Sequence, residues 1–225
     1  MHETRDGHDP QDDQPQPVQF GEAFWDERYS SAETLWSGNP NRYLVSEASD
    51  LDPGTALDVG CGEGADALWL AGRGWRVTGA DLSAVALGRA ARHAAQAGPG
   101  IAARIDWVHA DLTGWDPGPA RYGLVSSQYV HLPPGAREAL FRALAGVVAP
   151  GGSLLVVGHH PSDLQTTMRR PPMPELFFTG SDIAPLLDSG DWKIITDEAP
   201  QRSAPDPDGR PVMIRDTVFR ARRGS

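Results

Sequence analysis

The spacing of hydrophobic and polar residues changes between two periods along the chain, and this alternation predicts strands and helices in turn. Short apolar runs rich in strand-forming residues predict strands at 55–60, 75–80, 105–110, 122–127 and 152–160. Apolar positions at helical spacing predict helices at 65–74, 83–98 and 134–149. Strands that alternate with helices are typical of βαβ units. We therefore expect an α/β fold with a mostly parallel sheet buried on both faces.

The segments before this core differ in composition. Residues 1–18 are rich in Asp, Gln and Pro, so they cannot bury enough apolar surface to fold and are expected to form a disordered acidic tail. Aromatic residues at helical spacing predict a helix within 21–31, and a short helix should run from Arg42 to about Ala48.

The segments after the core predict a hairpin. Strands are expected at 192–198 and 212–221, with a Pro/Asp/Gly-rich loop between them at 199–210. Since no helix separates these strands, they should pair and leave one strand antiparallel to the others. A short helix is expected at 181–190, whereas the proline-rich 161–178 segment lacks apolar periodicity and predicts a long loop.

Length and composition narrow the possible functions. The 225 residues fit one domain, expected at 19–225. With 20 basic and 30 acidic side chains the formal charge is −10, which argues against a nucleic-acid partner. Cys61 is the only cysteine, which excludes an internal disulfide and a cysteine-based zinc site. No apolar run is long enough to span a membrane, and the N-terminus lacks an apolar signal region. We therefore expect a cytoplasmic monomer or homodimer without a membrane partner.

A glycine-rich turn carries the clearest functional signal. The first core strand ends at Asp58, and Gly60, Gly62 and Gly64 follow before the next helix begins. Glycines let the backbone approach a ligand closely, and the helix start behind them offers free N–H groups. The second strand ends in Asp81, about twenty residues after Gly60, where an acid binds ribose hydroxyls in nucleotide-binding βαβ units.

Two ligands compete for this turn. Gly60, Gly62 and Ala65 also satisfy the dinucleotide pattern G-x-G-x-x-A. However, Asp58 would repel a pyrophosphate and suits a ligand ammonium group. Asp111 ends the third strand and could accept a hydrogen bond from an adenine amino group. Acids at three successive strand ends therefore favour a cationic nucleoside with an amino-acid tail.

The ordered motifs resemble a known family. D-V-G-C-G-E-G, G-A-D-L-S, H-A-D-L, Y-G-L-V-S-S and A-P-G-G-S-L-L-V-V-G, within residues 55–158, are similar to the motifs of class I S-adenosylmethionine-dependent methyltransferases. The N-terminal W-D-E-R-Y and L-W-S-G-N-P-N are similar to those of small bacterial thiopurine- and tellurite-type enzymes. The resemblance implies a three-layer, doubly wound, Rossmann-like fold whose seven-stranded sheet has an antiparallel last strand. It also implies S-adenosylmethionine as the cofactor.

The resemblance also implies roles for individual residues. The three glycines of the turn would line the methionine and ribose part of the cofactor, and Asp58 would hold its amino group through water. Asp81 would bind the ribose hydroxyls, and Asp111 the adenine amino group. The remaining cofactor contacts would come from Leu82 and Leu112 beside the adenine, Ser127 and Gln128 beside the methyl donor, and Trp36 as a lid.

The acceptor is expected to be a small molecule. The fourth strand is followed by S-S-Q-Y, not by the Asn/Asp-Pro-Pro-aromatic run of nucleic-acid amino methyltransferases, and Cys61 lies inside the cofactor turn. His131 follows the fourth strand, and His159 and His160 follow the fifth, so the three imidazoles could converge on the acceptor. His131 is the candidate general base, with His159 and His160 as further candidate catalytic residues. One alternative is that His159 caps backbone groups while His160 is solvated. Another is a metal site with Asp163, but we expect no metal.

The sequence therefore predicts an enzyme that moves a methyl group from S-adenosylmethionine to a small-molecule acceptor. Two alternatives stay open. One is an NAD(P)-dependent oxidoreductase, and the other is a protein of the same fold that binds the cofactor without transferring its methyl group.

Overall fold

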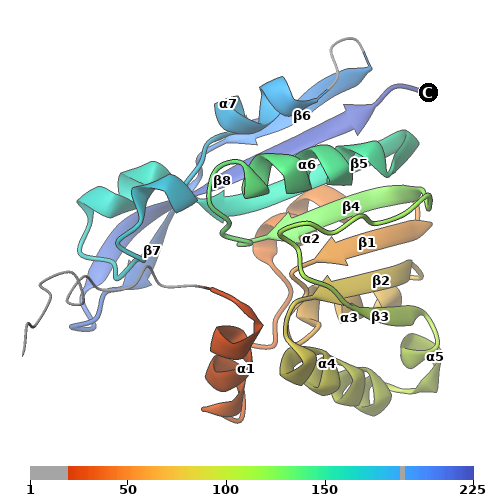
Figure 1. The fold of residues 1–225 in the computed structure, drawn as a ribbon, viewed down its shortest axis with the longest axis horizontal. Helices are drawn as coiled ribbons and strands as arrows, with labels where there is room; N and C mark the ends of the chain where they lie inside the picture. The colour runs from red at the N-terminus through yellow and green to blue at the C-terminus, as the bar shows by residue number, and fades with distance from the viewer. Residues whose placement is uncertain (1–19, 188–190) are drawn as a thin grey trace, which may run out of the picture.

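A single large sheet organises the chain. The computed structural model describes residues 20–187 and 191–225, and Figure 1 presents its fold. The strands lie in the order β3-β2-β1-β4-β5-β8-β6, and β7 also pairs with β8. Their bounds are β1 Thr55–Val59, β2 Arg76–Asp81, β3 Ile105–His109, β4 Tyr122–Gln128, β5 Val148–His159, β6 Trp192–Glu198, β7 Gln201–Pro205 and β8 Pro211–Arg223.

Helices cover both faces of this sheet and one of its edges (Figure 1). They are α1 Glu22–Ser30, α2 Arg42–Ala48, α3 Ala65–Gly72, α4 Ala84–Ala97, α5 Pro99–Ala102, α6 Ala136–Gly146 and α7 Gly180–Ile183. Short 3₁₀ helices lie at η2 Pro161–Gln165, η3 Pro174–Leu176 and η4 Ala184–Leu186. The sequence-based helices at 42–48, 65–74 and 83–98 are confirmed to within a few residues. The helix expected at 134–149 ends early, because β5 already begins at Val148.

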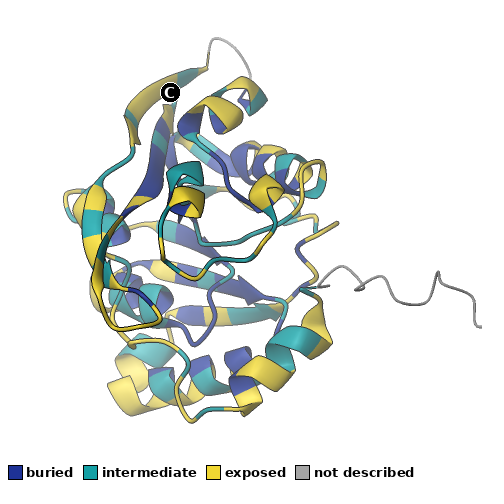
Figure 2. Cartoon of the chain, turned by 90° about the vertical axis from the view of Figure 1, so that its left-hand side faces the viewer, coloured by how far each residue is buried: buried dark blue, intermediate teal, exposed yellow. Residues whose placement is uncertain are grey.

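The alternation of side chains along the strands builds two apolar cores. In β1, Leu57 and Val59 face a core that includes Phe141 and Leu144 of α6. Ala56, the residue before Leu57, faces the opposite core with residues of α2 and α3. Figure 2 views the sheet from the edge where β1 and β4 end, and the buried strands lie between partly exposed helices. The predicted three-layer, mostly parallel architecture is confirmed.

The strand count exceeds the expected seven by one. β6 and β8 pair antiparallel, as predicted, but residues 201–205 are strand β7 and not part of a loop. β7 and β8 form a hairpin whose turn is closed by Asp206. The Asp206 carboxylate accepts hydrogen bonds from the backbone N–H groups of Asp208 at 3.0 Å and Arg210 at 2.8 Å. The polar sequence of β7 has no apolar alternation, so periodicity did not reveal it.

The 161–178 segment is packed and is not a free loop. The Asp163 side chain is fully buried; its carboxylate accepts hydrogen bonds from Arg170 Nη2 at 2.7 Å and from the backbone N–H of Arg215 at 2.8 Å. Phe178 is also buried and lies against Gly158. The segment is therefore fixed to β8 by the hydrogen bond from Arg215 and to β5 by the packing of Phe178, while the ion pair with Arg170 joins two parts of the segment itself.

The structure bears on two further expectations. Among the described residues, no helix combines the length and apolar character that crossing a bilayer requires. The expected tail at residues 1–18 lies outside the described residues.

We predict that Asp163→Asn lowers the free energy of unfolding by about 3 kcal/mol or more, because it leaves the Arg170 guanidinium in a mostly buried site without its carboxylate. Asp208→Asn is the matched control, since Asp208 pairs with Arg210 in solvent, and its effect should stay within about 0.5 kcal/mol. Urea unfolding measures both. Equal, small effects would mean that the 161–178 segment contributes little to the folded state.

Candidate functional site

The glycine turn after β1 adopts the backbone conformation that its sequence requires. Gly60, Gly62 and Gly64 have φ angles of +71°, +52° and +85°, in the left-handed region that favours glycine. The backbone N–H groups of Gly60 and Cys61 donate to the carbonyl oxygen of Ala80, at 2.8 and 3.1 Å. The turn is thereby fixed to the carboxyl end of β2.

Side chains from three distant segments contact these glycines. An added Cβ on Gly60 would overlap with Val130 Cγ2, and one on Gly62 would lie 2.8 Å from the hydroxyl oxygen of Tyr29. At Gly64 the nearest atom would belong to Trp107, at 2.7 Å. Close packing and backbone conformation therefore both exclude a side chain at each position.

Asp81 lies beside the turn at the end of β2. Its two carboxylate oxygens accept hydrogen bonds from the backbone N–H groups of Gly62 and Ser83, each at 2.8 Å. Burial raises the pKa of this carboxyl group, and these hydrogen bonds oppose the rise. Each oxygen keeps a lone pair, so Asp81 can still accept a further hydrogen bond.

Asp58 is a buried acid with an unsatisfied oxygen. Its side chain is 1% exposed, and Oδ2 has no hydrogen-bond partner among the described residues. Burial, together with the charges of Asp66 and Asp81, raises the pKa of Asp58 well above its ordinary range. Burial also raises the pKa of Asp66 to about 6. A cation bound here would relieve this repulsion.

The predicted positions that follow β2 and β3 differ in burial. Asp111 is exposed, and its carboxylate accepts hydrogen bonds from the backbone N–H and hydroxyl of Thr113, at 3.0 and 2.7 Å. These hydrogen bonds lower the pKa of Asp111. Leu112 is buried and Leu82 half-buried, and His109 Nε2 lies 2.8 Å from the carbonyl oxygen of Leu82. The Asp111 carboxylate is thus ionised and open to solvent.

Two polar side chains at the end of β4 lack full partners. Ser127 is buried, and its Oγ has no hydrogen-bond partner among the described residues; Gln128 Oε1 is also unpaired. Val59 of β1 pairs with Ser127 in the sheet, which places Ser127 next to the start of the glycine turn. These atoms are available to a ligand held at the turn.

The N-terminal segment is attached to the turn through Glu63, which sequence reasoning missed. Glu63 Oε2 accepts hydrogen bonds from the backbone N–H groups of Leu35 and Trp36, both at 3.2 Å, while Arg89 Nη1 donates to Oε1 at 2.9 Å. Trp36 Nε1 donates to the Tyr29 hydroxyl at 3.1 Å, and its indole remains 51% exposed. Trp36 therefore lies over Gly62 with room to meet a ligand.

The lone cysteine is a packed residue of this turn. Cys61 is 8% exposed, and its sulfur would be 3.2 Å from a Cβ added to Gly79. Burial, reinforced by the charges of Asp58 and Asp81, raises the pKa of the Cys61 thiol. The thiol is therefore protonated and unreactive at neutral pH.

Two of the three predicted histidines come together. The rings of His131 and His159 are stacked with centroids 4.8 Å apart, and the ring of Tyr129 lies 4.7 Å from that of His159. Phe177 closes the group, with centroids 6.4 and 6.3 Å from the two imidazoles. Burial lowers the pKa of His131 to about 3 and also lowers that of His159, so both rings are neutral at pH 7.

Behind His159 lies Asp216 of β8, a second residue that sequence reasoning missed. The buried Asp216 carboxylate accepts hydrogen bonds from Arg202 Nε at 2.6 Å and the Tyr43 hydroxyl at 3.1 Å. His159 Nδ1 lies 3.7 Å from Asp216 Oδ1. Burial alone would raise the pKa of Asp216, but its interactions with His159 and Arg202 hold that pKa well below its ordinary range.

His160 lies in a different setting from the other two. Its Nδ1 atom is 2.9 Å from Ser162 Oγ and accepts from the Ser162 backbone N–H, so the ring caps helix η2. Among the described residues, no group of three or more His, Cys, Asp or Glu side chains is arranged to hold a metal ion. The sequence offered capping as the alternative role of His159 and a solvated ring as that of His160, whereas in the structure His160 is the residue that caps a helix.

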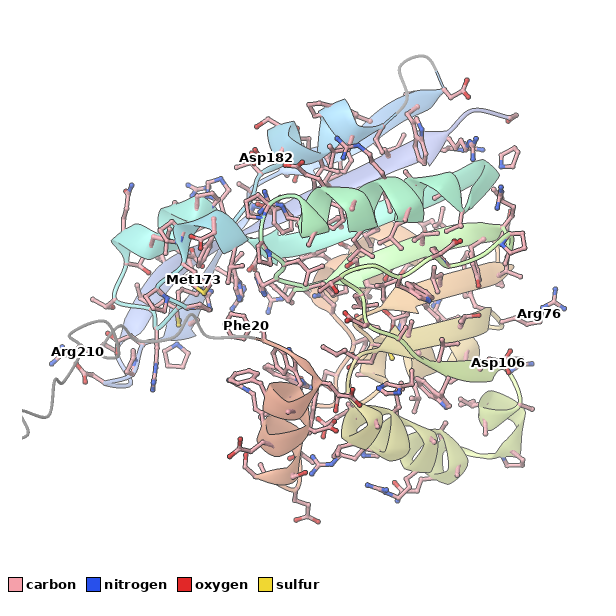
Figure 3. The ribbon with its side chains drawn as sticks, viewed as in Figure 1. Phe20, Arg76, Asp106, Met173, Asp182 and Arg210 are labelled. Atoms are coloured by element: carbon pink, nitrogen blue, oxygen red, sulfur yellow. The ribbon has the colours of Figure 1, made fainter. Side chains whose placement is uncertain are left out.

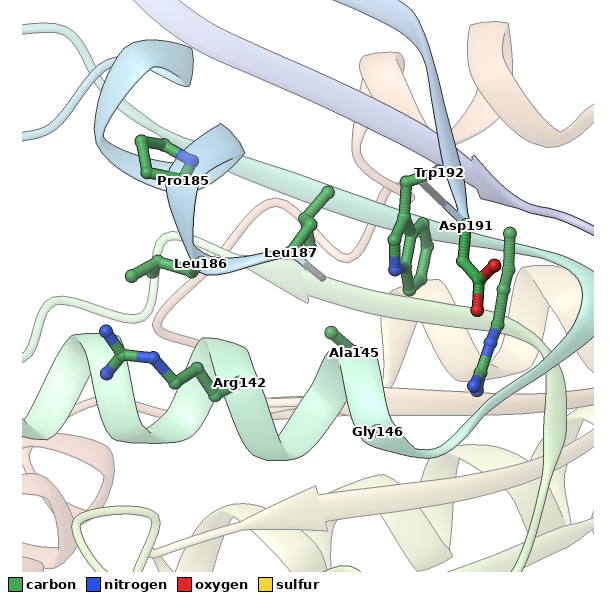
Figure 4. Close-up of a pocket in the computed structure, with 9 residues that line it drawn as sticks. Arg142, Ala145, Gly146, Pro185, Leu186, Leu187, Asp191 and Trp192 are labelled. Carbon is green, nitrogen blue, oxygen red and sulfur yellow. The ribbon is translucent and has the colours of Figure 1, made fainter. Parts of the chain in front are cut away.

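One cavity lies away from all these residues. It has a volume of about 290 Å³ and is lined by residues of α6, η4 and the start of β6, among them Arg142, Leu186 and Trp192 (Figure 4). None of the sequence-predicted site residues lines it. Since parallel strands of this class bind ligands at their carboxyl ends, the glycine turn remains the stronger candidate.

Comparisons with known proteins bear on the part of the chain that holds the glycine turn. Residues 56–152 match the family model described as a methyltransferase domain. The matched residues include the glycine turn and strands β1 to β4, and they make up less than half of the chain. The resemblance found in the motifs is thereby confirmed, and the match argues against the dinucleotide alternative.

The curated relatives align with this chain over only part of their own lengths. An uncharacterized methyltransferase of Mycobacterium tuberculosis is 42% identical over 124 residues, 54% of this chain and 59% of that protein. A ubiquinone biosynthesis O-methyltransferase of Serratia proteamaculans is 36% identical over 118 residues, 51% and 47% of the two chains. The chain therefore spans about half the length of these curated relatives.

Solved structures match more of the chain. A SAM-dependent methyltransferase of Anabaena variabilis gives a TM-score of 0.65 at 20% identity and covers 90% of this chain and 93% of that one. The magnesium protoporphyrin IX methyltransferase of Synechocystis with bound SAH gives 0.60 at 20% identity, over 81% and 78%. At this identity the likeness extends to the fold of the methyltransferase domain.

We predict that Gly60→Ala lowers the free energy of unfolding by about 2–4 kcal/mol, because it adds both left-handed strain and overlap with Val130. Gly209→Ala is the control: its φ is +78° but the space around it is open, so about 1 kcal/mol should be lost. Denaturant unfolding measures both, and Val130→Ala should recover part of the Gly60→Ala loss. No recovery would contradict the predicted contact.

A second prediction concerns the proton held by the buried acids. A carboxyl group whose pKa is higher in the folded chain stabilises the fold at low pH and loses that stabilisation as the pH rises toward its folded pKa. Asp66→Asn removes this titration, so the variant should gain about 1–3 kcal/mol relative to the wild type between pH 4 and pH 7. Urea unfolding across this range measures the gain. A constant difference between the two proteins would contradict it.

Proposed function

We propose that this protein transfers a methyl group from S-adenosylmethionine to a small-molecule acceptor. The observation that carries the proposal is the buried, unsatisfied Asp58 oxygen beside a glycine turn, with Asp81 and Asp111 at the next strand ends. Such an array of acids suits a cationic nucleoside with an amino-acid tail. S-adenosylmethionine is the cofactor predicted from the sequence, and the family match and the SAH-bound neighbour support it.

The residues of the turn fit the parts of this cofactor. Asp58 Oδ2 would receive the ammonium group, directly or through water, and Asp81 would receive the ribose hydroxyls. Asp111 would accept from the adenine amino group, with Leu82 and Leu112 beside the base. Trp36 would cover the methionine part, and the unpaired atoms of Ser127 and Gln128 would face the reacting end.

When bound, the cofactor would supply an electrophilic methyl group, and the protein would hold the acceptor in position to receive it. Methyl transfer is an in-line displacement, so catalysis depends mainly on holding the acceptor opposite the sulfur and excluding water. The aromatic rings of Tyr129, His131, His159 and Phe177 line the neighbouring part of the carboxyl edge. Their neutral, apolar surfaces suit an organic acceptor.

A small molecule is the acceptor class that the charge and the relatives favour. The net charge of −10 disfavours polyanionic partners such as nucleic acids. Named relatives include a ubiquinone biosynthesis O-methyltransferase and a 2-heptyl-1-hydroxyquinolin-4(1H)-one methyltransferase, which is 31% identical over 106 residues. We propose the same broad class of acceptor here.

We predict that Asp81→Ala weakens S-adenosylmethionine binding by about 10²-fold or more, because two ribose hydroxyls lose a charged acceptor. Asp106→Ala is the matched control: Asp106 is exposed on β3 and lies at the amino end of the sheet, beside Arg76 and far from Phe20 and Met173 (Figure 3). Isothermal titration calorimetry measures affinity, and thermal unfolding checks that both variants fold. Unchanged affinity in folded Asp81→Ala would remove Asp81 from the ribose site.

Turnover separates an enzyme from a non-methylating cofactor-binding protein. Formation of S-adenosylhomocysteine that depends on an added acceptor supports methyl transfer. Cofactor binding without product across phenol, thiol, amine and carboxylic acid acceptors would favour the non-methylating alternative.

A further inference from the structure

The neutral histidine pair has one member that is built to accept a proton. His159 Nδ1 is buried and its polar neighbour is Asp216 Oδ1 at 3.7 Å, whereas 18% of the side chain remains exposed. With Nδ1–H directed toward the carboxylate, Nε2 carries the lone pair and is the nitrogen left to meet an acceptor. Separations of this length between catalytic partners commonly shorten when substrate binds.

His131 lacks such support. Its Nε2 atom is buried without a hydrogen-bond partner among the described residues, and no acidic side chain forms an ion pair with it there. A proton taken up by His131 would therefore create an uncompensated buried charge. The geometry therefore favours His159 as the base over His131, the candidate expected from the sequence. His131 is then a ring that packs against His159.

Asp216 is held in place from three directions. Arg202 of β7 and Tyr43 of α2 donate hydrogen bonds to it, and β8 carries its backbone next to β5, with Asp216 opposite His159 in the register. The carboxylate therefore cannot rotate away from the imidazole. It is positioned to stabilise the imidazolium ion that forms when His159 accepts a proton.

The surroundings select among acceptor classes. The positive charges of Arg170 and Arg202 are each paired with a buried carboxylate, Asp163 and Asp216. A hydroxyl acceptor keeps its proton at neutral pH and needs a base, whereas a thiol ionises more easily. Tyr129, His131 and Phe177 present aromatic surface around His159, which suits a planar ring.

We propose that His159, oriented by Asp216, is the general base that activates an aromatic hydroxyl acceptor. This inference rests on the proposed function. The acceptor O–H proton passes to His159 Nε2 while the oxygen bonds to the methyl carbon, and the carbon–sulfur bond of the donor breaks with its electron pair left on sulfur. Nothing is oxidised or reduced, and His159 then releases its proton to water.

The test compares a substituted phenol with the thiophenol that has the same ring, at about pH 8. The thiophenol is already ionised and needs no base, whereas the phenol keeps its proton. His159→Gln should lower kcat for the phenol about 10²–10⁴-fold and kcat for the thiophenol less than about tenfold. Asp216 acts as a positioning residue, so Asp216→Asn should show the same selective loss, of about 10²-fold.

His131→Gln is the discriminating variant. It should change the phenol and thiophenol rates by the same factor, because His131 contributes packing and no proton transfer. A selective loss of phenol turnover in this variant, with none in His159→Gln, would overturn the assignment. If Asp216→Asn fails to fold, His159→Gln and His131→Gln decide the question on their own.

Calorimetry with S-adenosylmethionine keeps the two proposals apart. Absence of cofactor binding by the wild-type protein would contradict the proposed function. Cofactor binding with turnover of thiophenols or amines, but of none of the phenols, would leave methyl transfer intact and overturn the hydroxyl assignment. Equal losses for both acceptors in His159→Gln would do the same.

Discussion

The carboxylate of Asp81 fixes the geometry on which the site depends. One oxygen holds the backbone of Gly62 and the other holds that of Ser83, so a single side chain joins the glycine turn to the start of α4. Ser83 in turn caps α4 and donates to Asp26 of α1. The turn, the second strand, and two helices are thereby set relative to each other before any ligand arrives.

The same edge concentrates acidic groups at a cost in stability. Burial and the charges of Asp66 and Asp81 favour the protonated form of Asp58 in the free protein, and burial does the same for Asp66. A ligand that brings positive charge reverses this preference. The site therefore exchanges protons for its ligand, which ties affinity to pH through ordinary linkage.

The parts predicted from sequence are those determined by local pattern. Gly60, Gly62, Gly64 and Asp81 are close in sequence and follow strands whose apolar runs are plain. Asp216 was missed because its partners Tyr43 and Arg202 lie 173 and 14 residues away along the chain, and only the sheet brings them together. β7 was missed for a related reason, since its pairing with β8 relies on backbone hydrogen bonds and the Asp206 turn.

The histidines illustrate the limit of residue type as evidence. The sequence does not distinguish the three histidines. In the structure His131 packs against a ring, His159 faces a carboxylate and His160 caps a 3₁₀ helix. The sequence placed all three near the acceptor edge. Their different surroundings depend on Asp216 and Ser162, which no motif marks.

The burial of Cys61 makes this protein convenient for spectroscopy. Its sulfur is the only thiol in the chain, and it is enclosed and protonated. A cysteine introduced at an exposed position such as Trp36 would be the single site that reacts readily with a maleimide dye or spin label. The N-terminal segment could then be followed over the glycine turn by fluorescence or electron paramagnetic resonance without removing the native cysteine.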